Sequence, residues 1–167
     1  MNQNSLQSLD QILNRTIKVY RQLLEVVRRE REILIEADLE ELNENNAIKE
    51  KILIELREWE EKRILIVAQI AKENQINMEE PRLLDLANHF SGEKGDRLRN
   101  LHSVLVLLLK RVQEFNQQNE DLVRAALENI SGALNNIKNH LQEKSTYERK
   151  GRLKEGTQDA HFVSKEA

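Results

Sequence analysis

The chain has no cysteine, one proline and five glycines among its 167 residues. Without cysteine there is no disulfide, no thiolate metal ligand and no cysteine nucleophile, which is typical of a protein in a reducing cytoplasm. Because proline and glycine interrupt helices and form β-turns, their scarcity predicts an all-α fold. Aromatic residues make up only 4% of the chain. We therefore expect an elongated bundle whose narrow core is built from Leu, Ile and Val.

Long apolar runs are missing as well. The longest, residues 104–109, has six residues, whereas a membrane-spanning helix needs roughly 20. The first residues have neither the basic start nor the apolar stretch of a signal peptide. The net charge of −3 argues against general nucleic-acid binding, which needs a concentrated positive surface. We expect a cytoplasmic protein without membrane insertion and without a nucleic-acid partner.

Apolar residues at helical spacing are abundant, and they predict a first helix over residues 5–36. Its apolar face consists of Leu6, Leu9, Leu13, Ile17, Tyr20, Leu24, Val27 and Leu34. The charged cluster at residues 28–32 is interpreted as a solvated face. Asp38 and Glu41 have the spacing of a capping box, so a second helix, antiparallel to the first, is predicted over residues 39–73. The alternative is one unbroken helix through Asp38.

The apolar face of the second predicted helix is less regular than that of the first. It consists of Leu39, Leu42, Leu53, Leu56, Trp59, Ile64, Val67 and Ile70. Asn45, Asn46 and Lys49 make this face more polar near the turn. Pro81 suits the first turn of a helix, where its missing N–H would be unpaired anyway, and predicts a short helix over residues 81–90.

Gly92 and Gly95 predict a loop, and Asp96 is the expected N-cap of the longest helix, residues 97–143. Its apolar residues alternate in steps of three and four, the spacing of a heptad repeat. They are Leu98, Leu101, Leu105, Leu108, Val112, Phe115, Asn119, Leu122 and Ala126, and the pattern continues through Leu127, Ile130, Leu134, Ile137 and Leu141. Residues 1–143 are thus predicted to form one domain, followed by a mobile basic tail over residues 144–167.

No residue pattern in the chain predicts chemistry. The four histidines are scattered, and Asp85 with His89 would supply only two ligands of a metal shell. The Glu-x-x-His pairs of di-iron bundles are missing, and the loop from Gly92 to Gly95 lacks the spacing of a phosphate-binding loop. The acidic pairs belong to solvated helix faces, which do not tune carboxylates for acid–base catalysis. We expect no catalytic residues, no cofactor and no metal.

The apolar stripe over residues 127–141 is the most informative surface. It is interpreted in three ways: as core, as the seam of a homodimer, or as a surface that receives an amphipathic helix from another protein.

Several segments of the chain resemble FlgN-type flagellar export chaperones. Those similar to the first helical hairpin of the family are Leu23-Leu24, Glu30 to Leu34, Asp38 to Leu42 and Lys49 to Leu53. The stretch from Phe115 to Leu122 is similar to the Asn-x-x-Asn element of the family, and the stretch from Tyr147 to Gly151 to its Tyr-x-x-x-Gly element. The likeness covers residues 6–151.

This resemblance implies a cytoplasmic chaperone that binds hook–filament junction proteins, prevents their premature assembly and delivers them to the flagellar type III export apparatus. It also implies a client-binding C-terminal region. The partner-binding residues expected there are Leu127, Ile130, Leu134, Ile137, Leu141 and Tyr147. The alternative is a coiled-coil scaffold or obligate dimer that uses the same stripe for itself.

Overall fold

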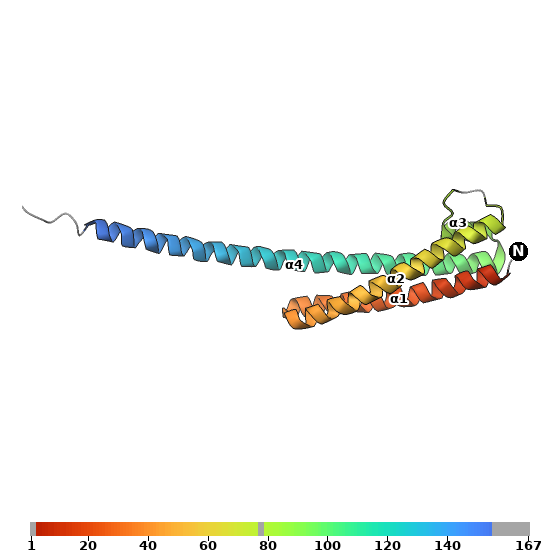
Figure 1. Cartoon of the computed structure of the whole chain (residues 1–167), viewed down its shortest axis with the longest axis horizontal. Helices are drawn as coiled ribbons and strands as arrows, with labels where there is room; N and C mark the ends of the chain where they lie inside the picture. Colours follow the sequence, from red (N-terminus) through yellow and green to blue (C-terminus); the bar gives the residue numbers. More distant parts are fainter. Residues whose placement is uncertain (1–2, 77–78, 155–167) are drawn as a thin grey trace, which may run out of the picture. The chain divides into compact units, whose positions relative to one another are not determined.

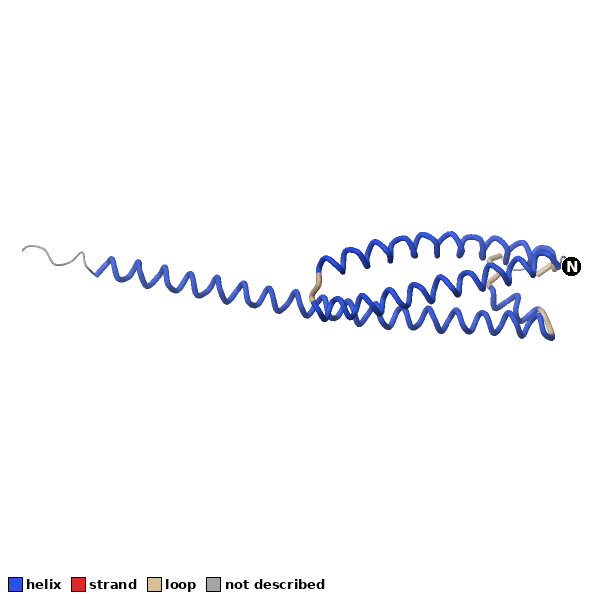
Figure 2. Tube along the Cα trace, turned by 90° about the horizontal axis from the view of Figure 1, so that it is seen from below, coloured by secondary structure: helices blue, strands red, loops and turns tan. Residues whose placement is uncertain are grey.

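The computed structural model describes residues 3–76 and 79–154, with side chains over residues 4–76 and 79–142. These residues form four helices and no strand (Figure 2). The helices are α1 (Gln3–Glu36), α2 (Leu39–Glu73), α3 (Leu83–His89) and α4 (Gly92–Lys154). The all-α prediction of three main helices and a short connecting one is confirmed.

The chain divides into two compact units, which are described separately. The N-terminal unit, Met1–Leu122, contains α1, α2, α3 and the first part of α4. The C-terminal unit, Val123–Ala167, contains the remainder of α4. Within the N-terminal unit, α1 and α2 lie side by side as an antiparallel hairpin (Figure 1).

The turn between α1 and α2 confirms the predicted break in the helix. The Asp38 carboxylate accepts a hydrogen bond from the Glu41 backbone N–H at 2.9 Å, which caps the first turn of α2. Ala37 has φ of 56°, and the Asp38 N–H donates to the Ile33 carbonyl at 3.3 Å. A left-handed residue followed by this bond is the Schellman arrangement that ends many helices.

The connection from α2 to α4 differs in detail from the prediction. Helix α3 begins at Leu83 rather than at Pro81, because Arg82 occupies the N-cap position. The Asp85 carboxylate accepts a hydrogen bond from the Arg82 backbone N–H at 2.9 Å. This bond satisfies an N–H that would otherwise lack a partner at the start of the helix.

Helix α4 is longer at both ends than the predicted 97–143. It begins at Gly92, which has φ of 66°, and the expected N-cap Asp96 lies inside it, paired with Arg99 at 2.6 Å. A Cβ atom on Gly95 would lie 2.0 Å from the Phe90 carbonyl oxygen. The glycines therefore allow the chain to turn sharply and α4 to start early. The helix continues to Lys154, past residue 144 where the tail is predicted to begin, and residues 155–167 lie outside the described residues.

The core of the N-terminal unit draws side chains from all four helices. Those from α1 and α2 are Leu9, Leu13, Ile17, Val19, Leu23, Leu24, Val27, Leu56, Val67, Ile70 and Ala71. Those from α3, the following residue and α4 are Leu83, Leu86, Ala87, Phe90, Leu98, Leu101, Leu108 and Val112. Val19 and Leu23 lie outside the single predicted face of α1. The buried face of α1 is wider than predicted because α1 packs in one core with side chains of both α2 and α4.

The predicted face of α2 is only partly buried. Leu56, Val67 and Ile70 belong to the core, whereas Leu39, Leu53 and Ile64 are exposed. Helix α2 is apolar on more than one side, so the spacing of its residues did not identify which side packs against α1.

Candidate partner-binding surface

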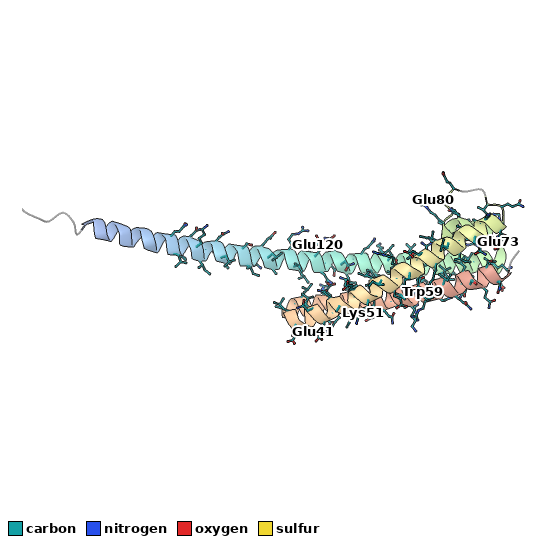
Figure 3. All side chains as sticks on the ribbon, in the orientation of Figure 1. Glu41, Lys51, Trp59, Glu73, Glu80 and Glu120 are labelled. Atoms are coloured by element: carbon teal, nitrogen blue, oxygen red, sulfur yellow. The ribbon has the colours of Figure 1, made fainter. Side chains whose placement is uncertain are left out.

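The predicted stripe over residues 127–141 lies entirely in the C-terminal unit. We call its five members the C-terminal stripe: Leu127, Ile130, Leu134, Ile137 and Leu141. Each of the five side chains is between 57% and 63% exposed, and the side chains of this segment stand out from the helix (Figure 3). Large contiguous apolar patches on a protein surface are typical of interaction sites, which makes this stripe the candidate surface.

The C-terminal stripe does not continue the seam of the first part of α4. Continued in steps of three and four, the seam through Asn119 and Leu122 would reach Ala126, Asn129, Ala133, Asn136 and His140. These residues are small or polar. Every member of the C-terminal stripe comes one position later, so the heptad register changes near residue 123, against the continuous pattern inferred from the sequence. The stripe therefore lies on a different face of the helix from the seam that packs in the N-terminal unit.

Tyr147 was the sixth residue predicted to bind a partner. Its backbone is helical within α4, and its side chain lies outside the described side chains. The surface that can be described is thus the C-terminal stripe alone.

A partly buried polar cluster, with Asn119 buried and Asn116 exposed, joins α1, α2 and α4 in the N-terminal unit. We call it the polar layer: Glu30, Lys49, Asn116 and Asn119. The Lys49 Nζ atom lies 2.7 Å from Glu30 Oε2 and 3.3 Å from Asn116 Oδ1. The Asn119 amide donates to Glu30 Oε2 at 3.0 Å and to the Val27 carbonyl at 3.0 Å.

Because the polar layer is largely shielded from water, its ion pair and hydrogen bonds are costly to break. The side chains of Glu30 and Lys49 are only 13% and 21% exposed, and Asn119 is 4% exposed. Because a buried charge without its partner is costly, a shift of α4 along the hairpin would be penalised. A buried asparagine in a helical seam fixes register in the same way, at a cost in stability. The layer thus sets the alignment of α4 on the hairpin.

Only part of this layer is predictable from the sequence. The charged cluster at residues 28–32 was interpreted as a solvated face, which is wrong for Glu30. Lys49 is a polar residue on a face that the sequence predicts to be apolar, and Asn119 lies at a predicted seam position. Chain positions alone did not show that these side chains meet, because they come from three helices far apart in sequence.

Contacts within the hairpin shift the pKa values of Glu55 and Tyr20. Hydrogen bonds from the Trp59 indole at 3.2 Å and from Arg15 at 2.7 Å lower the pKa of Glu55. Burial raises the pKa of Tyr20, and the nearby Glu60 carboxylate raises it further. The Trp59 bond lies within α2, whereas the Arg15 bond and the contact of Tyr20 with Glu60 join α1 to α2.

The described residues contain no group of three or more His, Asp or Glu side chains that could hold a metal ion. His89 and Asp85, the pair noted in the sequence, lie on α3, where Asp85 caps the helix. No helix within residues 3–76 and 79–154 is long and apolar enough to cross a membrane.

Comparison with known proteins identifies the family. The family model described as FlgN protein matches residues 1–155, which include all four helices and the C-terminal stripe. The chain belongs to the FlgN family. It is accordingly a flagellar export chaperone, with a place in type III export and flagellum assembly. Neither the curated proteins nor the solved structures compared with the chain gave a match.

The two units of this FlgN protein differ in how their apolar side chains are packed. The N-terminal unit has a complete core and a polar layer that aligns its helices. The C-terminal unit has apolar side chains and no described core of its own. The five side chains of the C-terminal stripe are exposed in the described structure.

Proposed function

We propose that this FlgN protein binds hook–filament junction proteins in the cytoplasm, prevents their premature assembly and delivers them to the flagellar export apparatus. The C-terminal stripe, with Tyr147, is the client-binding surface. The observation that supports this proposal is that five large apolar side chains at heptad spacing are more than half exposed.

The physical reason is complementarity between amphipathic helices. A protein that assembles through helical segments exposes apolar stripes before assembly, and a partner helix can cover them through anchors at i, i+3, i+4 and i+7. Burying one Leu or Ile side chain contributes about 1.5–3 kcal/mol before the cost of ordering is subtracted. Five such anchors are enough for reversible binding. The protein acts in this proposal by binding alone, without catalysis, cofactor or metal.

The test places charges on the stripe and measures folding and binding on the same preparation. Ile130→Glu combined with Ile137→Glu should abolish binding to purified hook–filament junction proteins, because an unpaired charge at an interface costs several kcal/mol to desolvate. The melting temperature should stay the same, since both side chains are exposed in the free protein.

The matched control is Asn135→Glu combined with Asn139→Glu, which adds two charges to the opposite face of the same helix. This control should bind junction proteins like the original chain. A sharp fall in melting temperature for the stripe variant would show that the stripe is core. Retained client binding together with loss of a dimer would favour the scaffold alternative.

A further inference from the structure

The tip of the α1–α2 hairpin carries apolar side chains that do not belong to the core of the N-terminal unit. Ile33 is only 1% exposed, yet it lies outside the core cluster. Leu34, Leu42 and Leu122 are half-buried, and they are not packed against that cluster either. We call these four residues the tip cluster.

The members of the tip cluster come together from three helices. The hydrogen bonds between side chains of α1 and α4 join residues that are 87 or 89 positions apart in the chain. Leu122 therefore lies level with residues 33–35 of α1. Across the hairpin, Glu41 pairs with Arg29, so Leu42 lies level with the last two turns of α1. The cluster is thus one small group at the end of the hairpin.

The polar layer separates the tip cluster from the core on each of the three helices. The order from core to tip is apolar, polar and again apolar: Val27, Glu30 and Ile33 on α1, Ile52, Lys49 and Leu42 on α2, and Phe115, Asn119 and Leu122 on α4. Asn45, which is 6% exposed, adds a further polar side chain on α2. Apolar packing therefore does not run without interruption from the core into the tip.

Few interactions hold the tip closed. The side chains of the Arg29–Glu41 ion pair are 45% and 37% exposed, and Arg31 donates a hydrogen bond to the exposed Gln118 at 2.5 Å. Exposed pairs of this kind contribute little to stability. The turn itself contains Ala37 in the left-handed region, which is unfavourable for a residue with a Cβ atom.

Opening of the tip would stop at the polar layer. Separating Glu30 from Lys49 would leave partly buried charges without partners, which is costly. The Asn119 Oδ1 atom, in contrast, is buried and accepts no hydrogen bond from any described residue. Water admitted by an open tip can donate to this oxygen and remove the cost of an unsatisfied acceptor. The open state thus keeps the ion pair and gains a hydrogen bond.

We propose that the hairpin tip, residues 31–44, is a separate cooperative unit that opens and closes while the core and the polar layer stay folded. Opening uncovers the tip cluster, including Leu122, the last residue of the N-terminal unit. The tip is a conformational device that exposes further apolar surface without unfolding the core.

Hydrogen exchange of the full chain over a series of low urea concentrations tests this proposal. The amides of residues 31–36 and 42–44 should exchange roughly a hundredfold faster than core amides, with one shared and shallow urea dependence, because a small unit exposes little surface when it opens. Equal rates and slopes for tip and core would overturn the proposal. A gradual rise in rate toward Ala37 without a shared slope would also overturn it, because that is ordinary fraying of helix ends.

Two variants on α1 separate the tip from the core. Val19, which is 0% exposed, belongs to the core. Val19→Ala should accelerate exchange of the core amides and leave the tip amides unchanged, because the closed and the tip-open states lose the same contacts. Acceleration of both sets by the same factor would show a single cooperative unit and overturn the proposal.

The matched variant, Ile33→Ala, removes a buried side chain from the tip cluster. It should accelerate exchange of the tip amides by roughly tenfold or more. Core amides should accelerate as well, because global unfolding also opens the tip. Unchanged tip amides in this variant would mean that the tip cluster does not hold the tip closed, and would overturn the proposal. None of these measurements uses a client, so their outcome is independent of the function proposed above.

Discussion

Ala37 has a backbone conformation that suits glycine better than alanine. Its φ of 56° lies in the left-handed region, where the Cβ atom of an L-residue crowds its own backbone. Ala37→Gly should therefore raise the free energy of unfolding by about 1 kcal/mol. Thermal or denaturant unfolding of the full chain measures this change.

The control for this substitution is the same exchange inside a helix. Ala68 is exposed on α2, and Ala68→Gly should lower stability by about 1 kcal/mol, since glycine is a poor helix former. If both glycine variants were destabilised alike, the left-handed turn at Ala37 would not exist in solution.

Glu30 shows at the residue scale where a sequence pattern is ambiguous. It stands in a run of five charged residues, and such runs usually face water. In the structure it is the acceptor shared by Lys49 and Asn119. One helical turn contains side chains that point in opposite directions, so charge density alone cannot tell which member of the run faces inward.

Helix α4 combines two different segments in one element. Its part in the N-terminal unit has a buried seam, and its part in the C-terminal unit has exposed side chains over residues 123–142. A helix without packing partners depends on the intrinsic propensities of its residues, and isolated helices are marginal in water. Gly132 lies in this segment, and a Cβ atom there would meet no other atom within 4 Å.

Gly132→Ala should therefore increase the helix content of the free protein and tighten binding to junction protein. The expected gain is up to about fivefold in affinity, because alanine is favoured over glycine in a helix by roughly 1 kcal/mol and the cost of ordering the helix falls. Circular dichroism and calorimetric titration measure the two effects. Gly132 lies two residues from both Ile130 and Leu134, on the side of the helix away from the stripe, so the added methyl group should not touch the client.

Gly95→Ala provides the contrast on the same helix. Its Cβ atom would lie 2.0 Å from the Phe90 carbonyl oxygen, so this variant should lose stability.

No gain in helicity or affinity with Gly132→Ala would indicate that the second part of α4 is already fully helical without a client.

At the scale of the whole molecule, truncation should separate folding from client binding, because the core and the C-terminal stripe lie in different units. A chain truncated after Ala126 keeps every buried residue of the core, the last of which is Val112, and the whole polar layer. It should melt at the temperature of the original chain. It should also fail to bind junction proteins, because it lacks the C-terminal stripe. Calorimetry and a binding titration test both parts, and a lowered melting temperature would mean that residues 127–167 contribute to the fold.

The sequence by itself determined the fold class, the number of long helices, the break at Asp38 and the family. These features depend on local signals: helical spacing, a capping residue and the scarcity of glycine and proline. It also singled out the C-terminal stripe, because regular spacing of large apolar residues is visible without knowing what they contact.

Only the tertiary structure decided which faces of the helices are buried. The spacing of apolar residues places Ile64 on a packed face and Val19 outside one, whereas the structure exposes Ile64 and buries Val19. Their burial depends on which helices lie beside α2 and α1. The early start of α4 depends on the close approach of Gly95 to Phe90. The polar layer requires side chains from α1, α2 and α4 to meet. Each of these features is a contact between residues distant in the chain, and local patterns do not determine such contacts.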